Sequence, residues 1–197
     1  MRRELQHRIF VCVTGMPGAG KSVIARYIAN ELGVKLYTMG DAVRRAAKEA
    51  GVSSDAKSMM EFAKNLRRKY GSAVVARMIL EELKENSDKL LVIDGIRSID
   101  EVAEFRKHGS VVLVAVHASP RERFSRLKSR GRPDDPSTWE EFVERDMREL
   151  ELGIGNVIAL ADVMVVNEYY PLNVISQEAL KRVREVISKV VYAESGD

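Results

Sequence analysis

The feature that most constrains this chain is a glycine-rich octapeptide that directly follows a short apolar run. Residues 15–22 read GMPGAGKS, match the pattern G-x-x-x-x-G-K-[ST], and come after the run IFVCV. Glycines in such a turn let backbone N–H groups face an anion, and the helix that starts after the turn adds partial positive charge. The sequence therefore predicts a strand, a phosphate-binding loop and a helix over residues 21–32. The predicted loop consists of Gly15, Met16, Pro17, Gly18, Ala19, Gly20, Lys21 and Ser22.

Three side chains are suited to a triphosphate with its magnesium ion. Lys21 reaches the β and γ phosphates in loops of this pattern, and the Ser22 hydroxyl binds Mg²⁺. Residues 90–95 read LLVIDG, an apolar strand that ends in Asp94. At the carboxyl edge of a parallel sheet Asp94 would lie beside the loop and hold the water shell of the magnesium. The alternative is an aspartate in an ordinary turn before a helix.

Short apolar blocks alternate with segments of helical spacing along the whole chain. The blocks are residues 9–13, 34–37, 90–93, 111–116 and 163–166. This alternation predicts an α/β fold, a five-stranded parallel sheet flanked by helices, in one domain over residues 1–197. Residues 40–88 are predicted as a helical insert with turns near Gly51 and Gly71, and residues 131–138 as a short lid. A last helix is expected over residues 175–191.

Capping patterns mark the starts of three helices. A serine followed three residues later by glutamate forms a capping box, in which each side chain bonds a backbone amide of the other. Boxes are predicted at Ser98 with Glu101, Ser119 with Glu122, and Ser137 with Glu140.

Composition excludes several classes of protein. The chain has 197 residues, 45% hydrophobic and 31% charged, with one cysteine, which excludes a disordered tail or a disulfide scaffold. Its apolar runs are shorter than the about 20 residues that cross a membrane, so a cytoplasmic protein without a membrane partner is expected. A net charge of +3 is too small to indicate nucleic-acid binding. Cys12 is expected to be a buried strand residue.

Several arginines are candidates for phosphate contacts. Arg97 precedes the predicted Ser98 cap at the carboxyl edge, where it is either a phosphate clamp or a solvated loop residue. Arg126 and Arg130 lie four residues apart on one helix face, where their like charges repel each other. An anion between them would relieve this repulsion. Glu122 is the alternative partner of Arg126. Arg145 and Arg148 each follow a glutamate by four residues, so salt bridges within the helix are equally expected.

These motifs resemble those of adenylate kinases in type and in order. GDAVR at residues 40–44 is similar to their G-D-x-x-R element, and IDGIR at residues 93–97 to their D-G-F-P-R element without the proline. Residues 118–132 resemble the segment that leads into their lid. Two further segments contribute, ERDMREL at residues 144–150 and ADVMVVNE at residues 161–168. With them, nearly the whole chain resembles an archaeal P-loop family described only as adenylate kinase-related.

The resemblance implies a nucleoside-monophosphate-kinase fold with ATP and Mg²⁺ at the loop. It further implies that Asp41, Arg44 and Arg97 bind the acceptor and that Arg126 and Arg130 face the transferred phosphate. From the residues alone, Asp41 is equally a helix cap. Two departures stand out: Met39 replaces the threonine that precedes G-D, and the lid has no zinc-type cysteines.

The sequence supports three functions. The first is transfer of the ATP γ-phosphoryl group to a nucleoside monophosphate, most readily AMP. The second is phosphorylation of a hydroxyl, as in dephospho-coenzyme A kinase, with Asp41 as general base. The third is a slow ATPase that acts as a nucleotide-dependent switch or assembly factor. Small nucleotides are the expected partners in the first case, and nucleic acid is not expected because aromatic residues do not interleave with the basic ones.

Overall fold

A five-stranded parallel sheet forms the centre of the protein in a computed structural model that describes residues 8–132 and 135–195. The strands lie in the order β2-β3-β1-β4-β5, so the chain passes from the central β1 to the edge strand β2, returns to β3 beside β1, and then crosses to β4 and β5 on the other side. Their bounds are β1 Ile9–Thr14, β2 Leu36–Thr38, β3 Leu90–Ile96, β4 Ser110–His117 and β5 Val163–Val166. The predicted α/β class and the five strands are confirmed, although β2 begins two residues later than predicted.

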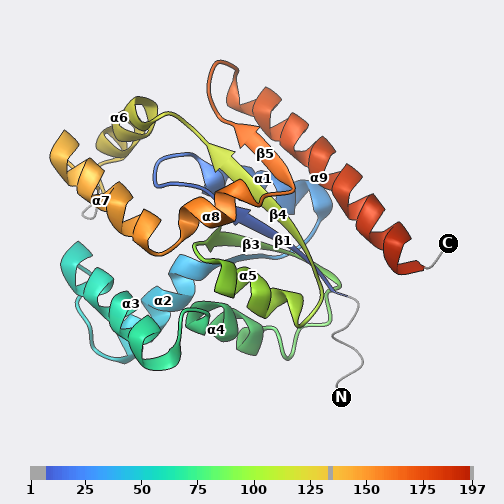
Figure 1. Cartoon of the computed structure of the whole chain (residues 1–197), viewed down its shortest axis with the longest axis horizontal. Helices are drawn as coiled ribbons and strands as arrows, with labels where there is room; N and C mark the ends of the chain where they lie inside the picture. Colours follow the sequence, from blue (N-terminus) through green and yellow to red (C-terminus); the bar gives the residue numbers. More distant parts are fainter. Residues whose placement is uncertain (1–7, 133–134, 196–197) are drawn as a thin grey trace.

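Helices connect consecutive strands and cover both faces of the sheet (Figure 1). They are α1 Lys21–Leu32, α2 Met39–Glu49, α3 Ala56–Tyr70, α4 Val74–Glu82, α5 Ile99–Arg106, α6 Pro120–Arg130, α7 Trp139–Glu151, α8 Ile154–Ala159 and α9 Leu172–Ser195. The predicted helix over residues 21–32 coincides with α1. The insert over residues 40–88 contains α2, α3 and α4. In Figure 1, α3, α6 and α7 extend beyond the carboxyl ends of the strands.

The alternation of side chains along β1 divides the interior into two apolar layers. Val11 and Val13 face α1 and α9, where they pack with residues such as Ile28 and Val183. Phe10 and Cys12 point to the other face, against α2, α4, α5 and α8. Because both faces of the strand are covered, β1 is apolar from Ile9 to Val13, as expected for a central parallel strand. Cys12 is fully buried, as expected, and burial raises the pKa of its thiol.

The predicted capping boxes are confirmed only in part. Ser98 caps α5 by accepting a hydrogen bond from the Glu101 amide, at 3.3 Å. Ser119 precedes α6 without a side-chain cap bond: its backbone amide donates to Glu168, and the Glu122 carboxylate pairs with Arg126. The third box lies one residue further along than predicted: Thr138 and Glu141 form it, and α7 starts at Trp139.

Candidate functional site at the carboxyl edge of the sheet

The glycine-rich loop over residues 15–22 joins β1 to α1 at the carboxyl edge, as predicted. Gly20 precedes the first turn of α1 with a φ of 90°, a conformation that disfavours any residue with a Cβ. A Cβ at this position would meet the side-chain nitrogen of Asn167 at 2.2 Å. That nitrogen donates to the Ala19 carbonyl at 2.9 Å, so the residue after β5 holds the loop directly. Gly20 is therefore required both by its backbone conformation and by the close approach of Asn167.

Arg123 of α6 also holds the loop, at Pro17. Its side chain is 5% exposed, donates Nη1 to the Pro17 carbonyl at 3.1 Å, and forms a two-bond ion pair with Asp146 of α7 at 2.8 and 2.5 Å. The guanidinium also stacks on the Phe142 ring, with 4.9 Å to the ring centre. The shape of the loop thus depends on contacts from α6, α7 and the segment after β5.

Arg126 lies at the loop, but it is also tied to its own neighbours. Its Nε donates to Glu122 at 2.9 Å and its Nη2 to the Asn167 carbonyl at 2.8 Å. The expected pair with Glu122 is therefore confirmed, and the phosphate contact of Arg126, which lies at the loop, stays a prediction. The remaining nitrogen, Nη1, is buried, has no hydrogen-bond partner, and lies about 4 Å from the Cβ position of Gly20.

Asp94 lies on β3 between the last residues of β1 and β2, where its Cα pairs with Val13 on one side and Thr38 on the other. A shift in register follows at once, because Ile96 and not Gly95 pairs with Thr14. Gly95, with a φ of 101°, is the extra residue of this bulge. The Asp94 side chain is 3% exposed, and its Oδ1 has no hydrogen-bond partner.

Lys21 is half-buried in the first turn of α1, and its pKa is lowered. Burial is the main cause, and Arg97 and Arg145 act in the same direction, while Asp94 and Glu149 oppose it. These interactions place charged groups from β3, from the residue after it and from α7 around the loop lysine. Ser22, beside it, is exposed at the same helix start.

The residues available for a magnesium ion fit that metal. A buried carboxylate oxygen without a partner on Asp94 and an exposed hydroxyl on Ser22 are hard oxygen ligands at one edge. Magnesium is usually held by one or two protein oxygens together with substrate phosphates and water. In the described part of the chain, no group of three or more His, Cys, Asp or Glu residues gathers into a metal cage. The site thus matches the type in which the nucleotide completes the coordination.

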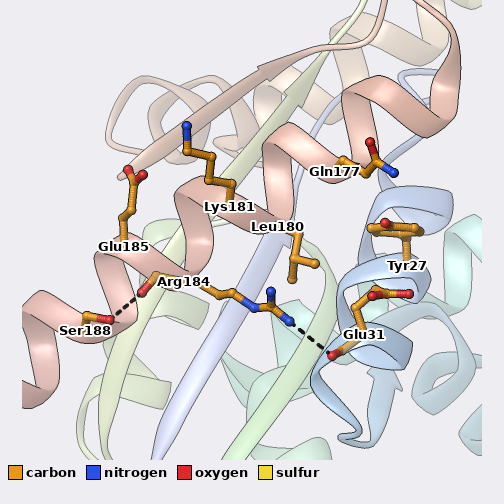
Figure 2. A pocket seen from close by; sticks show the side chains of 8 residues that line it. All are labelled: Tyr27, Glu31, Gln177, Leu180, Lys181, Arg184, Glu185 and Ser188. Atoms are coloured by element: carbon orange, nitrogen blue, oxygen red, sulfur yellow. Dashed lines mark hydrogen bonds between the residues drawn. The ribbon is translucent and has the colours of Figure 1, made fainter.

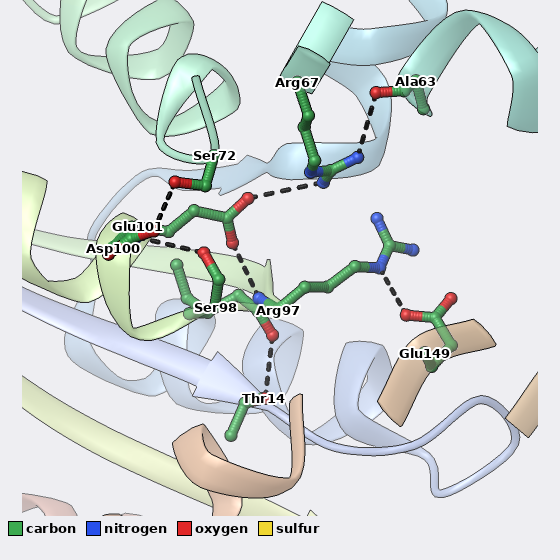
Figure 3. A network of polar contacts seen from close by, with 10 residues as sticks. Thr14, Ala63, Arg67, Ser72, Arg97, Ser98, Asp100, Glu101 and Glu149 are labelled. Atoms are coloured by element: carbon green, nitrogen blue, oxygen red, sulfur yellow. Dashed lines mark hydrogen bonds and ion pairs between the residues drawn. The ribbon is translucent and has the colours of Figure 1, made fainter. Parts of the chain in front are cut away.

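Arg97 follows β3 and is fixed at two points (Figure 3). Its backbone amide donates to Glu101 at 2.7 Å, and its Nε donates to Glu149 of α7 at 2.9 Å. Glu101 is fully buried and also faces Arg67 of α3 at 3.4 Å. The Arg97 side chain is 30% exposed. It is therefore an ordered residue at the edge of the site and not a freely solvated loop arginine.

Two predicted ligands lie on the exposed side of the insert. Asp41 is in the first turn of α2, but Thr38 occupies the cap position, so the interpretation of Asp41 as the cap is wrong. Its Oδ1 accepts from Nε and Nη2 of Arg44 at 3.1 and 2.5 Å. The two side chains are 53% and 60% exposed.

The segment after α6 carries a cluster of ion pairs. Arg130 forms two bonds to Asp135, at 2.8 and 2.5 Å, and Arg145 reaches the same carboxylate at 3.3 Å. Arg145 therefore does not make the expected pair with Glu141, which caps α7, whereas Arg148 pairs with Glu144 at 3.7 Å as expected. Part of the predicted lid, residues 133–134, lies outside the described residues.

A cavity of about 530 Å³ opens elsewhere, between α1 and α9 (Figure 2). It is lined by Tyr27, Glu31, Gln177, Leu180, Lys181, Arg184, Glu185 and Ser188. No residue of the glycine-rich loop and none of the arginines discussed above takes part. The cavity is distinct from the candidate site.

Sequence reasoning missed several residues of the site. Asn167 directly follows β5, so the rule that selected Asp94 at the end of β3 selects it too. Arg123 belongs to the arginine-rich helix, but no local pattern separates it from its neighbours. Glu149 and Asp146 come from α7, and their partners Arg97 and Arg123 are 52 and 23 residues away along the chain. Such pairs become visible only in three dimensions.

Solved structures with the same arrangement define the class of the fold. A shikimate kinase from Bacteroides thetaiotaomicron superposes with a TM-score of 0.62 at 16% identity, over 91% of this chain and 98% of that one. A gluconokinase from Sinorhizobium meliloti gives a TM-score of 0.60 at 17% identity, over 95% and 98%. With its glycine-rich loop and sheet order, this chain has the P-loop kinase fold.

Sequence relatives then give the family. A family model described as an AAA domain matches residues 11–149. A UPF0200 protein of Hyperthermus butylicus is 50% identical over 162 residues, which cover 82% of this chain and 87% of that protein. The chain belongs to the UPF0200 family. The prediction of a P-loop family with a kinase fold and archaeal members is confirmed. Among the described residues, no helix is long and apolar enough to cross a membrane.

Proposed function

We propose that this protein transfers the γ-phosphoryl group of ATP, with Mg²⁺, to a small acceptor that already carries a phosphate. A nucleoside monophosphate is the acceptor class, and AMP is its first candidate. The observation that carries the proposal concerns two atoms. Within residues 8–132 and 135–195, the buried side-chain atoms without a hydrogen-bond partner are Oδ1 of Asp94 and Nη1 of Arg126.

Both atoms border the glycine-rich loop, and their chemistry is complementary. An unpaired buried polar atom costs about 1–3 kcal/mol, so its retention at a site indicates a partner that arrives with the ligand. A carboxylate oxygen suits a hydrated magnesium ion, and a guanidinium nitrogen suits a phosphate oxygen. A magnesium nucleotide supplies both partners at once.

In this proposal, different residues of the site bind the donor phosphates, the metal ion and the acceptor. Lys21 and the loop amides would bind the β and γ phosphates, while Asp94 and Ser22 would hold the magnesium, which neutralises charge on the phosphates. Arg97 and Arg44 would bind the acceptor phosphate, with Arg126 and Arg130 around the group in transit. An oxygen of the acceptor phosphate bonds to the γ phosphorus as the bond to the β–γ bridging oxygen breaks, and ADP leaves. No general base is needed, because that acceptor oxygen is already ionised at neutral pH.

An acceptor with a phosphate fits these residues better than a hydroxyl acceptor. Shikimate and gluconate, which give two fold neighbours their names, present hydroxyls, and a hydroxyl must lose a proton during transfer. Arg97 offers a guanidinium at the edge of the site.

The test is ADP release from Mg-ATP with AMP, CMP, UMP, GMP, dCMP, dephospho-coenzyme A, shikimate and gluconate, each compared with no acceptor. We expect acceptor-dependent release with a nucleoside monophosphate. Lys21→Ala should slow turnover by about 100- to 1,000-fold, because it removes about 3–4 kcal/mol of transition-state stabilisation. Lys35→Ala, which removes an exposed lysine before β2, is the matched control.

Each other result contradicts the proposal in its own way. Release that depends on a hydroxyl acceptor would transfer the assignment to hydroxyl phosphorylation. Slow release that no acceptor accelerates would indicate an ATPase switch. Near-normal turnover in Lys21→Ala would remove the loop from the chemistry altogether.

A further inference from the structure

Glu149 holds the guanidinium of Arg97 from a helix that is remote in sequence. It lies in the last turns of α7, its side chain is 14% exposed, and its Oε2 accepts from Nε of Arg97 at 2.9 Å. Figure 3 shows this single contact at the end of the Arg97 side chain. Glu149 belongs to the segment ERDMREL, but no role for it follows from that segment, and the proposed mechanism gives it no task.

Positive charges surround Glu149 and keep it ionised. Burial acts to raise its pKa, but Arg97, Lys21 and Arg145 together outweigh burial, and the pKa lies below the ordinary value for glutamate. The same contact raises the pKa of Arg97. Glu149 therefore places a negative charge beside Arg97, on the proposed acceptor side of the site. It also lies near Lys21, on the donor side.

The contact at Nε leaves the rest of the Arg97 guanidinium available. Within the part of the chain that the structure describes, Arg97 bonds through its backbone amide and Nε, and no hydrogen bond from Nη1 or Nη2 is formed. In Figure 3 the two Nη atoms lie at the end of the side chain, beyond Nε, and no dashed line joins either of them to Glu149. Two nitrogens side by side in one plane are the donor pair that binds a phosphate through two parallel bonds.

Glu101 fixes the other end of the same residue. Its buried carboxylate accepts from the Arg97 backbone amide at 2.7 Å and from Nη2 of Arg67 at 3.4 Å, while its own backbone amide donates to the Ser98 hydroxyl. With the backbone fixed by Glu101 and Nε fixed by Glu149, the long arginine side chain is held at both ends. An arginine that is ordered before its ligand arrives loses less conformational entropy on binding.

We infer that Glu149 is a positioning residue for the acceptor: it orients Arg97 through Nε so that Nη1 and Nη2 receive the acceptor's phosphate. The inference rests on the proposed function, since it assumes a phosphorylated acceptor on this side of the site. Glu149 itself stays out of contact with the reacting atoms.

The competing interpretation predicts the opposite sign. If Glu149 only neutralises Arg97 and Lys21 in the empty site, it competes with phosphate, and removal of its charge strengthens nucleotide binding. If it positions Arg97, removal weakens acceptor binding, and an uncharged side chain of the same shape that still accepts from Nε restores it. Glu149→Ala and Glu149→Gln therefore separate the two interpretations.

Steady-state kinetics of these two variants form the first arm. We expect Glu149→Ala to raise the acceptor KM by about 10- to 100-fold, the effect of a lost hydrogen bond to a charged group, with less than about a threefold change in KM for ATP. Glu149→Gln should recover at least about tenfold of the loss. Glu144→Ala, an exposed glutamate on the same helix, is the control and should match the wild type. Equal losses in both Glu149 variants, no loss, or tighter binding would overturn the inference.

A second arm does not depend on catalysis. The Nε–H group of Arg97 gives an NMR signal that is sharp when the group is hydrogen-bonded, and inorganic phosphate serves as the probe ligand. We expect this signal in the wild type and in Glu149→Gln, its loss in Glu149→Ala, and a phosphate-induced shift only where it is present. If no acceptor stimulates ADP release in the wild type, the proposed function fails, and this arm still decides whether Glu149 orders Arg97. A sharp Arg97 signal in Glu149→Ala would overturn the inference.

Discussion

The two sides of the candidate site are held together by different kinds of contact. On the donor side, Arg123 and Asp146 form an ion pair whose side chains are 5% and 15% exposed, and Arg123 also holds the loop carbonyl of Pro17. On the side proposed for the acceptor, Arg44 and Asp41 form a pair that is 60% and 53% exposed. The first pair is built into the interior, whereas the second lies largely in water.

This difference indicates which parts are preformed and which can exchange partners. A buried pair that loses one member leaves a charge without a partner, so it is held strongly. An exposed pair contributes about 0–1 kcal/mol, so an incoming anion replaces the carboxylate at little cost. The loop side is thus rigid before nucleotide binds, while Arg44 can leave Asp41 for a phosphate.

The largest effect is expected when the buried pair on the donor side is broken. Arg123→Ala should lower the free energy of unfolding by about 3 kcal/mol, because Asp146 loses its partner in a mostly buried position. Chemical denaturation of the purified protein measures this change. Arg121→Ala, an exposed arginine of the same helix, should change it by less than about 0.5 kcal/mol. A loss below about 1 kcal/mol in Arg123→Ala would remove the contrast between the two sides.

A substitution at Asp94 is expected to have an effect of intermediate size, which raises thermal stability and lowers activity. Without nucleotide and magnesium, Asp94→Asn should raise Tm by about 2–6 °C, because a buried charge with an unpaired oxygen is replaced by a neutral group. Turnover should fall by about 100-fold, since a magnesium ligand is lost. Thermal melts and ADP release measure the two effects. Asp88→Asn, near the opposite end of β3, is the control, and a lowered Tm in Asp94→Asn would contradict the role given to the unpaired oxygen.

The smallest effect on stability is expected on the acceptor side. Arg44→Ala should change the free energy of unfolding by less than about 0.5 kcal/mol, as for exposed ion pairs in general. The KM for the acceptor should nevertheless rise about tenfold, because one phosphate contact is lost. Denaturation and acceptor titrations are run on the same sample. A stability loss above about 1 kcal/mol, or an unchanged KM, would show that Arg44 serves the fold and not the ligand.

The fold was predictable because its main signals are local and agree with one another. The strand β1, the glycine-rich loop and the helix α1 follow each other without a gap, and alternating apolar blocks indicated the remaining strands. The errors arose at the ends of elements. At Ser119 the expected box does not form, since the Ser119 amide donates to Glu168 and the Glu122 carboxylate pairs with Arg126, and a pattern of spacing cannot rank such alternative partners.

The candidate site was predictable only where a residue's place follows from a strand end. Asp94 and Arg97 lie at the predicted edge because β3 ends there. The partners that fix the arginines come from elsewhere in the chain: Glu149 for Arg97, and Asp146 for Arg123. Opposite charges attract whatever their separation in sequence. Which carboxylate meets a given arginine is therefore decided by how the helices and strands pack.

In the proposed function, the two unpaired atoms at the glycine-rich loop gain partners when a magnesium nucleotide binds the folded chain. Because a ligand that binds only the folded state shifts the folding equilibrium, the unfolded fraction rises as the supply of magnesium nucleotide falls. Proteases act on that fraction. If that nucleotide is the ligand, we expect the chain to be degraded fastest when nucleoside triphosphates are scarce.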